Sequence, residues 1–447
     1  MGRVRFYTVL VFARLAYLGI KILSRTSGTS FVGMMTLKLC PDFLAYCKSY
    51  AKRSVAVSGT NGKTTTSGML AYILETDKQS VIHNTKGANM LTGVANVFAL
   101  WVKPFKKFDY AVIESDEAYL TKLYDYFKTD CLIVTNLFRD QLDRYGELAT
   151  TAGFIKDAIG KNPSANIFLN ADDPLVTNLS RNGIYYGFED VEVCSDVHKS
   201  ESNAPTEVFN CICGKPLSYK KQFFAQQGHY YCEYCGYKRP ELDYRATVRI
   251  YSDYSQLTVC DVKAAKEYSF RVNQVGLYNA YNALAAISCA LYYGVSEDVI
   301  RESLMSYKSI FGRAERRVIN GHDTLVQLIK NPTGASEVLK TVDLDSNIVI
   351  AINDNYADGR DISWLWDSDF EQLKDARKLV ITSGIRAKDM ALRLKYAGIP
   401  QEKIILKEDI KSAIEFAASS VDKDEKITIL PSYTALLKIT KMKFQKG

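Results

Sequence analysis

A glycine-rich loop between an apolar run and a helical segment constrains this chain more than any other sequence feature. The loop reads SGTNGKTTT over residues 58–66 and directly follows the apolar run SVAV. Glycines let backbone N–H groups close around phosphate oxygens, and the N-terminus of the following helix adds partial positive charge. The sequence therefore predicts a P-loop between a strand and a helix, within an α/β fold.

The side chains of this loop indicate a nucleoside triphosphate with its metal ion. Lys63 is expected to bridge the terminal phosphates, and the Thr64 hydroxyl is expected to ligate Mg²⁺. The first glycine of the general P-loop pattern stands closer to the Gly-Lys pair here, as Gly59. We predict that ATP binds to the loop residues Gly59, Thr60, Asn61, Gly62, Lys63, Thr64 and Thr65.

Short runs rich in Val and Ile alternate with helical segments on both sides of a polar stretch, which is the pattern of parallel βαβ units. The polar stretch, residues 200–240, holds four clustered cysteines and is predicted to be an inserted module. From these shifts we expect three parts. They are an N-terminal helical region at 1–50, a central P-loop domain at 51–316 and a C-terminal Rossmann-like α/β domain at 317–447.

The N-terminal segment, residues 5–25, is dense in apolar residues but contains Arg14 and Lys21. A membrane-spanning helix needs about 20 consecutive apolar residues, so this segment does not qualify. No small-residue cleavage site follows it, which disfavours a signal peptide. We predict an amphipathic helix, for which two interpretations stay open: packing against the rest of the protein, or docking on a membrane surface.

Two acidic clusters follow apolar runs close to the P-loop. Glu114 opens the cluster ESDE, and Asp140 and Asp143 belong to the cluster RDQLD. Carboxylates at strand ends beside a P-loop are suited to Mg²⁺. We predict that Glu114 binds Mg²⁺ together with Thr64. For Asp140 and Asp143, stabilisation of a helix N-terminus is an equally good explanation.

Four of the ten cysteines form two pairs that are each followed by glycine. Such pairs are typical of zinc knuckles, in which four thiolates enclose a tetrahedral Zn²⁺. The first pair has C-x-C spacing, so either Cys211 reaches the metal through a strained loop or only three thiolates bind. Free thiols or a disulfide are the alternatives. We predict a structural zinc in a zinc-ribbon module, with the ligands Cys211, Cys213, Cys232 and Cys235.

The charge balance and the other cysteines limit the partners and the compartment. The chain has 57 Lys and Arg against 50 Asp and Glu, a net charge of +7. This excess suits a phosphate-rich ligand or an anionic surface, but no dense basic patch with interleaved aromatics indicates nucleic acid. The six scattered cysteines favour a reducing, cytoplasmic compartment.

Five motifs occur in the order seen in Mur ligases, and from about residue 55 to its end the chain resembles that family. The motifs are the GTNGKTTT loop, TN…DQLD at 135–143, LNADD at 169–173, GxxNxxN at 276–282 and FGRxE at 311–315. Mur ligases, which resemble folylpolyglutamate synthases, use ATP to convert a carboxylate into an acyl phosphate that an amine attacks. The resemblance implies that Asn279 and Arg313 contact the nucleotide and that Glu114 helps to hold Mg²⁺.

Departures from the usual motifs indicate one branch of the family. Gln141 stands where a histidine is usual, which puts a second metal site in doubt, and residues 328–332 read LIKNP in place of a motif that contains histidine. Together with the C-terminal segment DNYADGRD at 354–361, these features make the chain resemble the ligase-like subunits of lipid II isoglutaminyl synthases. That resemblance implies ATP-dependent amidation of the D-glutamate α-carboxyl of lipid II in peptidoglycan and cell-wall synthesis, at the inner face of the membrane. The alternative is a stand-alone Mur or folylpolyglutamate-type ligase that adds an amino acid.

The ammonia for such a reaction is predicted to come from a separate subunit. A glutaminase needs a nucleophilic cysteine with an activating base, and none of the four histidines lies in such a motif. The resemblance implies a glutaminase partner of the GatD type. Residues 352–367 combine aspartates with Trp364 and Trp366, which suits an interface. By resemblance, Asp358, with Asp361 as second choice, is expected to orient the catalytic histidine of the partner.

Overall fold

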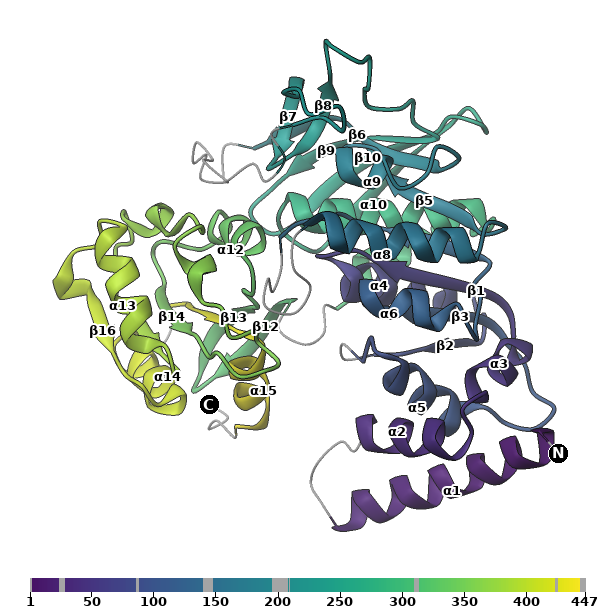
Figure 1. Ribbon diagram of the computed structural model, residues 1–447. Helices are drawn as coiled ribbons and strands as arrows, with labels where there is room; N and C mark the ends of the chain where they lie inside the picture. Colours follow the sequence, from purple (N-terminus) through teal and green to yellow (C-terminus); the bar gives the residue numbers. More distant parts are fainter. Residues whose placement is uncertain are drawn as a thin grey trace.

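The computed structural model describes residues 2–23, 29–85, 88–139, 148–194, 208, 210–308, 313–422 and 425–442. Within these residues the chain forms a layer of N-terminal helices, a nine-stranded sheet, a two-stranded hairpin and a six-stranded sheet (Figure 1). In the view of Figure 1 the N-terminal helices lie at the bottom, the hairpin at the top and the six-stranded sheet to one side. The α/β fold class is confirmed.

The N-terminal segment is helical, as expected. Its elements are α1 (Gly2–Leu23), α2 (Thr29–Leu39), α3 (Phe43–Cys47) and the 3₁₀ turn η1 (Lys48–Tyr50). Phe6 of α1 is buried and stacks on Phe43, with ring centroids 5.0 Å apart. One side of α1 therefore packs against the protein. Among the described residues, no helix has both the length and the apolar content needed to cross a membrane.

The nine-stranded sheet has the order β11-β10-β9-β6-β5-β4-β1-β3-β2. Strands β1 to β6 and β9 pair in parallel, whereas β9, β10 and β11 form an antiparallel meander. The meander was not predicted. The strands are β1 (Ala51–Ser58), β2 (Val81–His83), β3 (Phe108–Glu114), β4 (Cys131–Val134), β5 (Asn166–Asn170), β6 (Ile184–Val193), β9 (Tyr244–Ile250), β10 (Ser255–Asp261) and β11 (Lys266–Val272).

Helices cover both faces of this sheet, which is why its central strands are continuously apolar. One hydrophobic core joins one face to α4 (Lys63–Thr76), α10 (Leu277–Tyr292) and α11 (Glu297–Ser306). A second core joins the opposite face to the N-terminal helices and the remaining helices of this unit. These are α5 (Leu91–Trp101), α6 (Glu117–Leu123), α8 (Leu148–Lys161) and the short α9 (Pro174–Thr177).

The inserted module lies between β6 and β9 in the chain. It contains the antiparallel hairpin of β7 (Ser218–Phe224) and β8 (Gln227–Tyr231). Arg239, whose side chain is 12% exposed, joins the module to the main sheet, because its Nε donates to Asp172 Oδ1 at 2.6 Å. Asp172 also accepts hydrogen bonds from the backbone N–H of Phe188 and from the hydroxyl of Tyr281, both at 2.8 Å. The LNADD motif therefore helps to hold the module in place.

The six-stranded sheet has the order β12-β13-β17-β14-β15-β16, and all its pairs except β12–β13 are parallel. The expected boundary between residues 316 and 317 falls inside β12 (Arg313–Ile319), which pairs only within this sheet. The other elements are β13 (His322–Gln327), α12 (Pro332–Leu339), β14 (Asn347–Ala351), η2 (Ser363–Leu365), η3 (Phe370–Leu373), β15 (Val380–Ser383), α13 (Ala387–Tyr396), η4 (Gln401–Lys403), β16 (Ile404–Leu406), α14 (Ile410–Ser419), β17 (Ile427–Pro431) and α15 (Tyr433–Lys441).

Candidate functional site

The P-loop connects the end of β1 to the start of α4, as the sequence predicts. Gly59 and Gly62 have φ angles of 120° and 84°, a region that side chains disfavour. A Cβ atom at Gly62 would overlap Asn282 Oδ1, and one at Gly59 would overlap Thr135 Oγ1. Both glycines are therefore required by conformation and by space.

The segment that directly follows β4 forms hydrogen bonds with the P-loop. The backbone N–H of Thr60 donates to the carbonyl oxygen of Asn136 at 2.9 Å, and the N–H of Asn61 donates to Asn136 Oδ1 at 2.8 Å. Thr135 Oγ1 donates to the carbonyl oxygen of Asn61 at 2.7 Å. The TN pair of the 135–143 motif thus stabilises the loop itself.

The side chain of Lys63 is buried beneath the loop. Its Nζ donates to the carbonyl oxygen of Gly59 at 2.5 Å and to Glu117 Oε1 at 3.2 Å. Burial raises the pKa of Glu117, while the Lys63 charge opposes that rise. Glu117 was not predicted as a site residue. The sequence feature that could have indicated it is the ESDE cluster, in which Glu117 follows Glu114 by three residues and begins α6.

Thr64 and Glu114 meet beside the loop. Glu114 ends β3 and is only 1% exposed, and the Thr64 hydroxyl donates to Glu114 Oε2 at 2.8 Å. Strands β1 and β3 are parallel neighbours, so their carboxyl ends bring these residues to the same edge of the sheet. A hydroxyl and a carboxylate oxygen beside a phosphate cradle are the hard donors that Mg²⁺ prefers.

A pocket opens between the P-loop, α10 and the start of the second sheet. Asn279, whose Nδ2 donates to the carbonyl oxygen of Val275 at 2.8 Å, lines it together with Asn282. Its other lining residues include Asn61, Gly62, Thr65, Asn136, Phe138, Tyr278, Gln327, Leu328, Lys330 and Glu337. The structure thus brings the predicted Asn279 to the loop.

The second sheet contacts the P-loop through residues that were not predicted to belong to the site. Asn331 Nδ2 donates to Asn61 Oδ1 at 3.0 Å, and Lys330 Nζ donates to the carbonyl oxygen of Thr60 at 3.5 Å. Asn331 Oδ1 also caps α12 by accepting the N–H of Gly334 at 2.8 Å. The LIKNP segment had been noted only as a departure from a family motif.

The structure does not describe the side chains of four residues that the sequence singled out. Asp140, Gln141 and Asp143 lie outside the described residues. Arg313 begins β12, and only its backbone is described.

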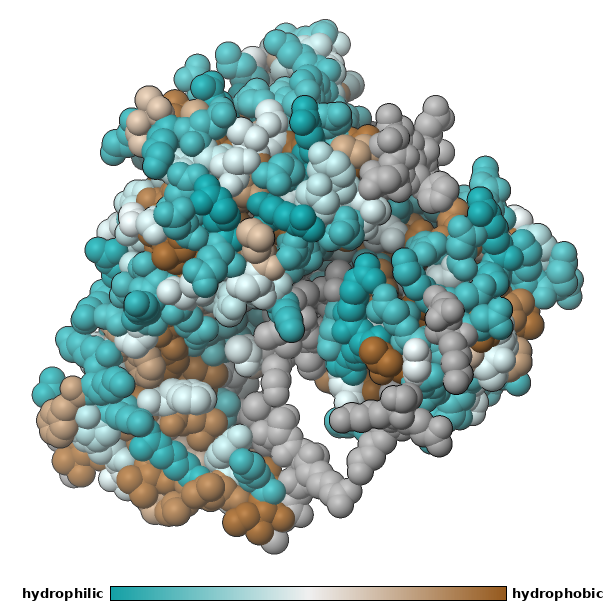
Figure 2. All heavy atoms as spheres, turned by 180° about the vertical axis from the view of Figure 1, so that it is seen from behind, coloured by the Kyte–Doolittle hydropathy of each residue, from teal (hydrophilic) through white to brown (hydrophobic). Residues whose placement is uncertain are grey.

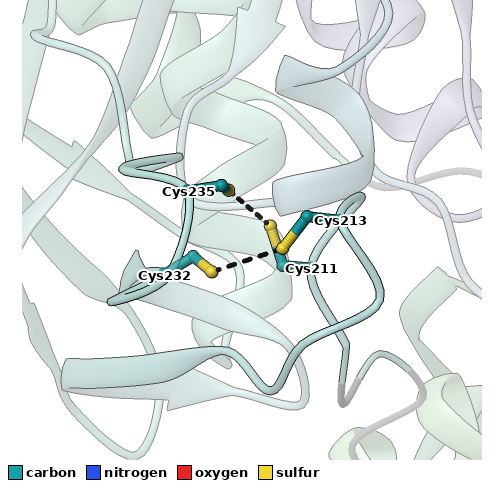
Figure 3. A group of neighbouring side chains, drawn as sticks. All are labelled: Cys211, Cys213, Cys232 and Cys235. Atoms are coloured by element: carbon teal, nitrogen blue, oxygen red, sulfur yellow. Dashed lines mark hydrogen bonds between the residues drawn. The ribbon is translucent and has the colours of Figure 1, made fainter.

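The four clustered cysteines converge in the inserted module (Figure 3). Their Sγ atoms all lie within 4.8 Å of one another. The Sγ atoms of Cys211 and Cys235 are 3.5 Å apart, and those of Cys213 and Cys232 are 3.7 Å apart. The C-x-C spacing therefore does not keep Cys211 from the group.

Local backbone geometry supports this cluster. Gly214 and Gly236 have φ angles of 80° and 74°, so each cysteine pair is followed by a turn that favours glycine. Although burial by itself would raise the pKa of Cys232, backbone N–H groups of Cys235 and Tyr234 lower that pKa to about 7. Burial raises the pKa of Cys211 to about 12, so within the cluster the loop favours the metal-binding thiolate form at Cys232 and not at Cys211.

Asp358 lies far along the chain from the P-loop, in the loop after β14. It is 8% exposed. Its Oδ1 accepts the backbone N–H of Thr434 at 2.7 Å, and its Oδ2 accepts the Thr434 hydroxyl at 2.5 Å and the N–H of Asn355 at 3.1 Å. Asp358 therefore joins its loop to the first turn of α15.

Comparisons with known proteins agree with this geometry. Residues 57–290 match the Mur ligase middle domain, and residues 328–436 match the MurT ligase C-terminal domain. A pseudomurein peptide ligase type C from Methanothermus fervidus has the same fold. The TM-score is 0.65 at 23% identity, over 87% of this chain and 79% of that one. The fold and the P-loop site thus define a protein of the Mur ligase class.

Two relatives assign the chain to one family within the Mur ligase class. The subunit MurT of lipid II isoglutaminyl synthase from Streptococcus pneumoniae is 36% identical over 94% of each chain. The MurT subunit from Staphylococcus aureus strain COL is 33% identical over 97% of this chain and 96% of the relative. The chain belongs to the MurT family, and the resemblance to Mur ligases is confirmed.

Proposed function

We propose that this chain is the ATP-dependent ligase subunit of a lipid II isoglutaminyl synthase. It converts the α-carboxyl of D-glutamate in the stem peptide to the amide of D-isoglutamine. The main support is the similarity to MurT subunits over 94% of the chain. In this chain the P-loop, the Thr64–Glu114 pair and the pocket also meet at one edge of the sheet. Because the substrate is lipid-linked and the reaction consumes ATP, we propose that the reaction takes place at the cytoplasmic face of the membrane.

The proposed reaction has two steps. A carboxylate oxygen attacks the γ-phosphorus of ATP, ADP leaves, and an acyl phosphate forms. Ammonia then attacks the acyl carbon, phosphate leaves with the bonding electrons, and the nitrogen loses a proton to give the amide. Negative charge on the transferring phosphoryl group is stabilised by the Lys63 ammonium and by backbone N–H groups of the loop other than those of Thr60 and Asn61, which donate to Asn136.

The remaining site residues bind rather than react. Asn279 and Arg313 are proposed to contact the nucleotide. Thr64 and Glu114 would hold Mg²⁺, which reduces the phosphate charge when bound. We also propose that the second domain begins at β12, so that the pocket lies at the junction of two domains.

The clustered cysteines are proposed to hold one structural Zn²⁺. With Zn–S bonds of about 2.3 Å, a tetrahedral site separates its sulfurs by about 3.8 Å. The observed separations of 3.5 Å and 3.7 Å are close to this value. Four thiolates leave no open coordination position, so such a metal would support folding rather than catalysis.

We infer that a glutaminase of the GatD type docks on the second domain and supplies ammonia. Asp358 is proposed as a positioning residue for the partner's histidine, because the family resemblance implies an aspartate in this role and Asp358 lies in the segment 352–367 that suits an interface. Asp358→Asn should then lower glutamine-dependent amidation at least tenfold and spare ammonium-dependent amidation by the same complex.

The matched control is Thr434→Val, which removes the hydroxyl that donates to Asp358 Oδ2. If Asp358 only anchors α15, this control should lower the same activity to a similar degree. Equal loss of both activities in Asp358→Asn would assign the residue to the ligase fold instead.

The overall function is tested by measuring ATP turnover and product formation with lipid II. The purified chain should form the amide with ammonium, and the complex should form it with glutamine. Product formed from an amino acid, with no response to ammonium, would contradict amidation and favour an amino-acid-adding ligase.

A further inference from the structure

Helix α1 carries two apolar stripes, and only one of them packs against the protein. Phe6, Val9, Leu10 and Ala13 are buried. Val11, Leu15, Leu18 and Ile22 form the other stripe and are 57%, 59%, 53% and 82% exposed. With a rotation of about 100° per residue, the two stripes lie on nearly opposite sides of the helix. Packing accounts for the first stripe and leaves the second unexplained.

The outer stripe continues onto two neighbouring elements. Phe31 and Met34 of α2 are each 53% exposed. Trp101, the last residue of α5, is 63% exposed, and Phe105 in the following loop is fully exposed with a φ of 66°. A bulky residue in this backbone region is uncommon, so the loop presents Phe105 to solvent at a conformational cost.

Two arginines of α1 join these elements into one surface. Arg5 Nε donates to the carbonyl oxygen of Leu39, at the end of α2, at 2.6 Å. Arg14 donates to the carbonyl oxygen of Val102 in the loop after α5. Figure 2 shows hydrophobic side chains gathered at the lower left, over the N-terminal helices. We call this surface the N-terminal apolar face; it comprises Val11, Phe12, Leu15, Leu18, Ile22, Phe31, Met34, Trp101 and Phe105.

The segments that build this face contain basic residues and no acidic ones. Residues 1–41 include six Arg and Lys and no Asp or Glu, and residues 78–108 include five Lys and no Asp or Glu. Lys21, Lys103, Lys106 and Lys107 are exposed. The net charge of the whole chain is only +7, so its positive excess lies in the two sequence segments that build this face.

We propose that the N-terminal apolar face docks on the surface of an anionic phospholipid bilayer. An apolar stripe flanked by cations is the composition of helices that lie in the membrane interface. Exposed Trp and Phe side chains fit the level of the lipid headgroups. A second copy of this face would bring like charges together. The inference deepens the proposed function, because it gives the surface on which a lipid-linked substrate is met.

The test is cosedimentation of the full chain with vesicles of phosphatidylglycerol and phosphatidylcholine, compared with phosphatidylcholine alone. We expect binding to the anionic vesicles that weakens with salt. Leu15→Ser with Leu18→Ser should weaken it at least tenfold. Lys103→Gln, Lys106→Gln and Lys107→Gln together should do the same, since each lysine near such a surface contributes about fivefold. Val318→Ser, at a 69% exposed position of β12, is the matched control and should bind as the parent does.

Equal binding of the parent chain and both variants, or no binding by the parent, would overturn the proposal. Loss of self-association in the variants, without any change in vesicle binding, would show that the face covers a second copy instead. Amidation of a water-soluble, short-chain lipid II analogue with ammonium should be unchanged in both variants. If that reaction fails in the parent while vesicle binding holds, the proposed function fails and the docking surface stands.

Discussion

Lys63 carries its charge on a buried side chain that is held by two backbone carbonyl oxygens and by the Glu117 carboxylate. When ATP binds, the ammonium is expected to turn from these acceptors to the terminal phosphates, where its charge stabilises the phosphoryl group during transfer. At the scale of single residues, the proposed reaction therefore depends on a few atoms beneath the P-loop.

We expect Lys63→Ala to lower ATP-dependent amidation by at least 100-fold, because loss of such a stabilising group costs about 3–4 kcal/mol in the transition state. Initial rates with ammonium as nitrogen source measure this effect. Lys52→Ala, which removes a lysine whose side chain is 64% exposed, should leave the rate unchanged. Near-normal turnover of Lys63→Ala would exclude this loop as the ATP site.

Glu114→Gln should raise the Mg²⁺ concentration needed for half-maximal activity about tenfold or more, because an amide oxygen is a weaker ligand than a carboxylate oxygen. Activity is measured against Mg²⁺ at saturating ATP. Glu192→Gln, at an exposed position of β6, serves as control. An unchanged Mg²⁺ requirement would remove Glu114 from the metal site.

At the scale of elements, the inserted module is held by its cysteine cluster and by the Arg239–Asp172 ion pair. Cys235→Ser should lose zinc and local order around β7 and β8 while retaining nucleotide binding, since metal binding and folding of such a module are coupled. Elemental analysis of zinc and nucleotide titration measure the two effects. A parent protein purified without chelators and free of zinc would contradict the assignment.

Loss of the ion pair between Arg239 and Asp172 should lower the free energy of unfolding far more than loss of an exposed ion pair. Arg239→Met leaves the fully buried Asp172 without its cation, and we expect it to lower the free energy of unfolding by about 3–5 kcal/mol. Arg249→Met breaks an ion pair whose side chains are 64% and 61% exposed, and should cost under about 1 kcal/mol. Denaturant unfolding compares the two variants, and equal losses would contradict the argument.

Strands β1, β3, β4 and β5 and the parallel strands of the six-stranded sheet were predictable, because each is a short apolar run and most end near polar or acidic residues. Strands β2 and β6 were not predicted. The β9–β11 meander was missed, although its burial alternates residue by residue, because exposed Arg and Glu dilute the apolar signal. Lys63, Thr64, Glu114 and Asn279, which were singled out by their motifs, all lie in or beside the loop. The contact of Asn331 with Asn61 depends on how two sheets meet, 270 residues apart in the chain, and no local pattern encodes it.

At the scale of the whole molecule, the pocket draws its walls from both large sheets. Asn331→Ala removes both a helix cap and the link to Asn61, so we expect the KM for ATP to rise several-fold and stability to fall by about 1 kcal/mol. Asp409→Ala removes the cap of α14 away from the pocket, and should cost similar stability without changing the KM. Parallel changes in KM for both variants would assign the effect to folding.

Under the proposed division into two domains, a pocket at their junction makes nucleotide affinity depend on how the two domains are placed relative to each other. By thermodynamic linkage, any protein that binds the second domain and favours one placement changes ATP affinity by a certain factor, and ATP changes the affinity for that protein by the same factor. With the proposed glutaminase bound to the second domain, the supply of nitrogen and the supply of phosphoryl groups would be coupled through the domain junction, although the two active centres need share no residue.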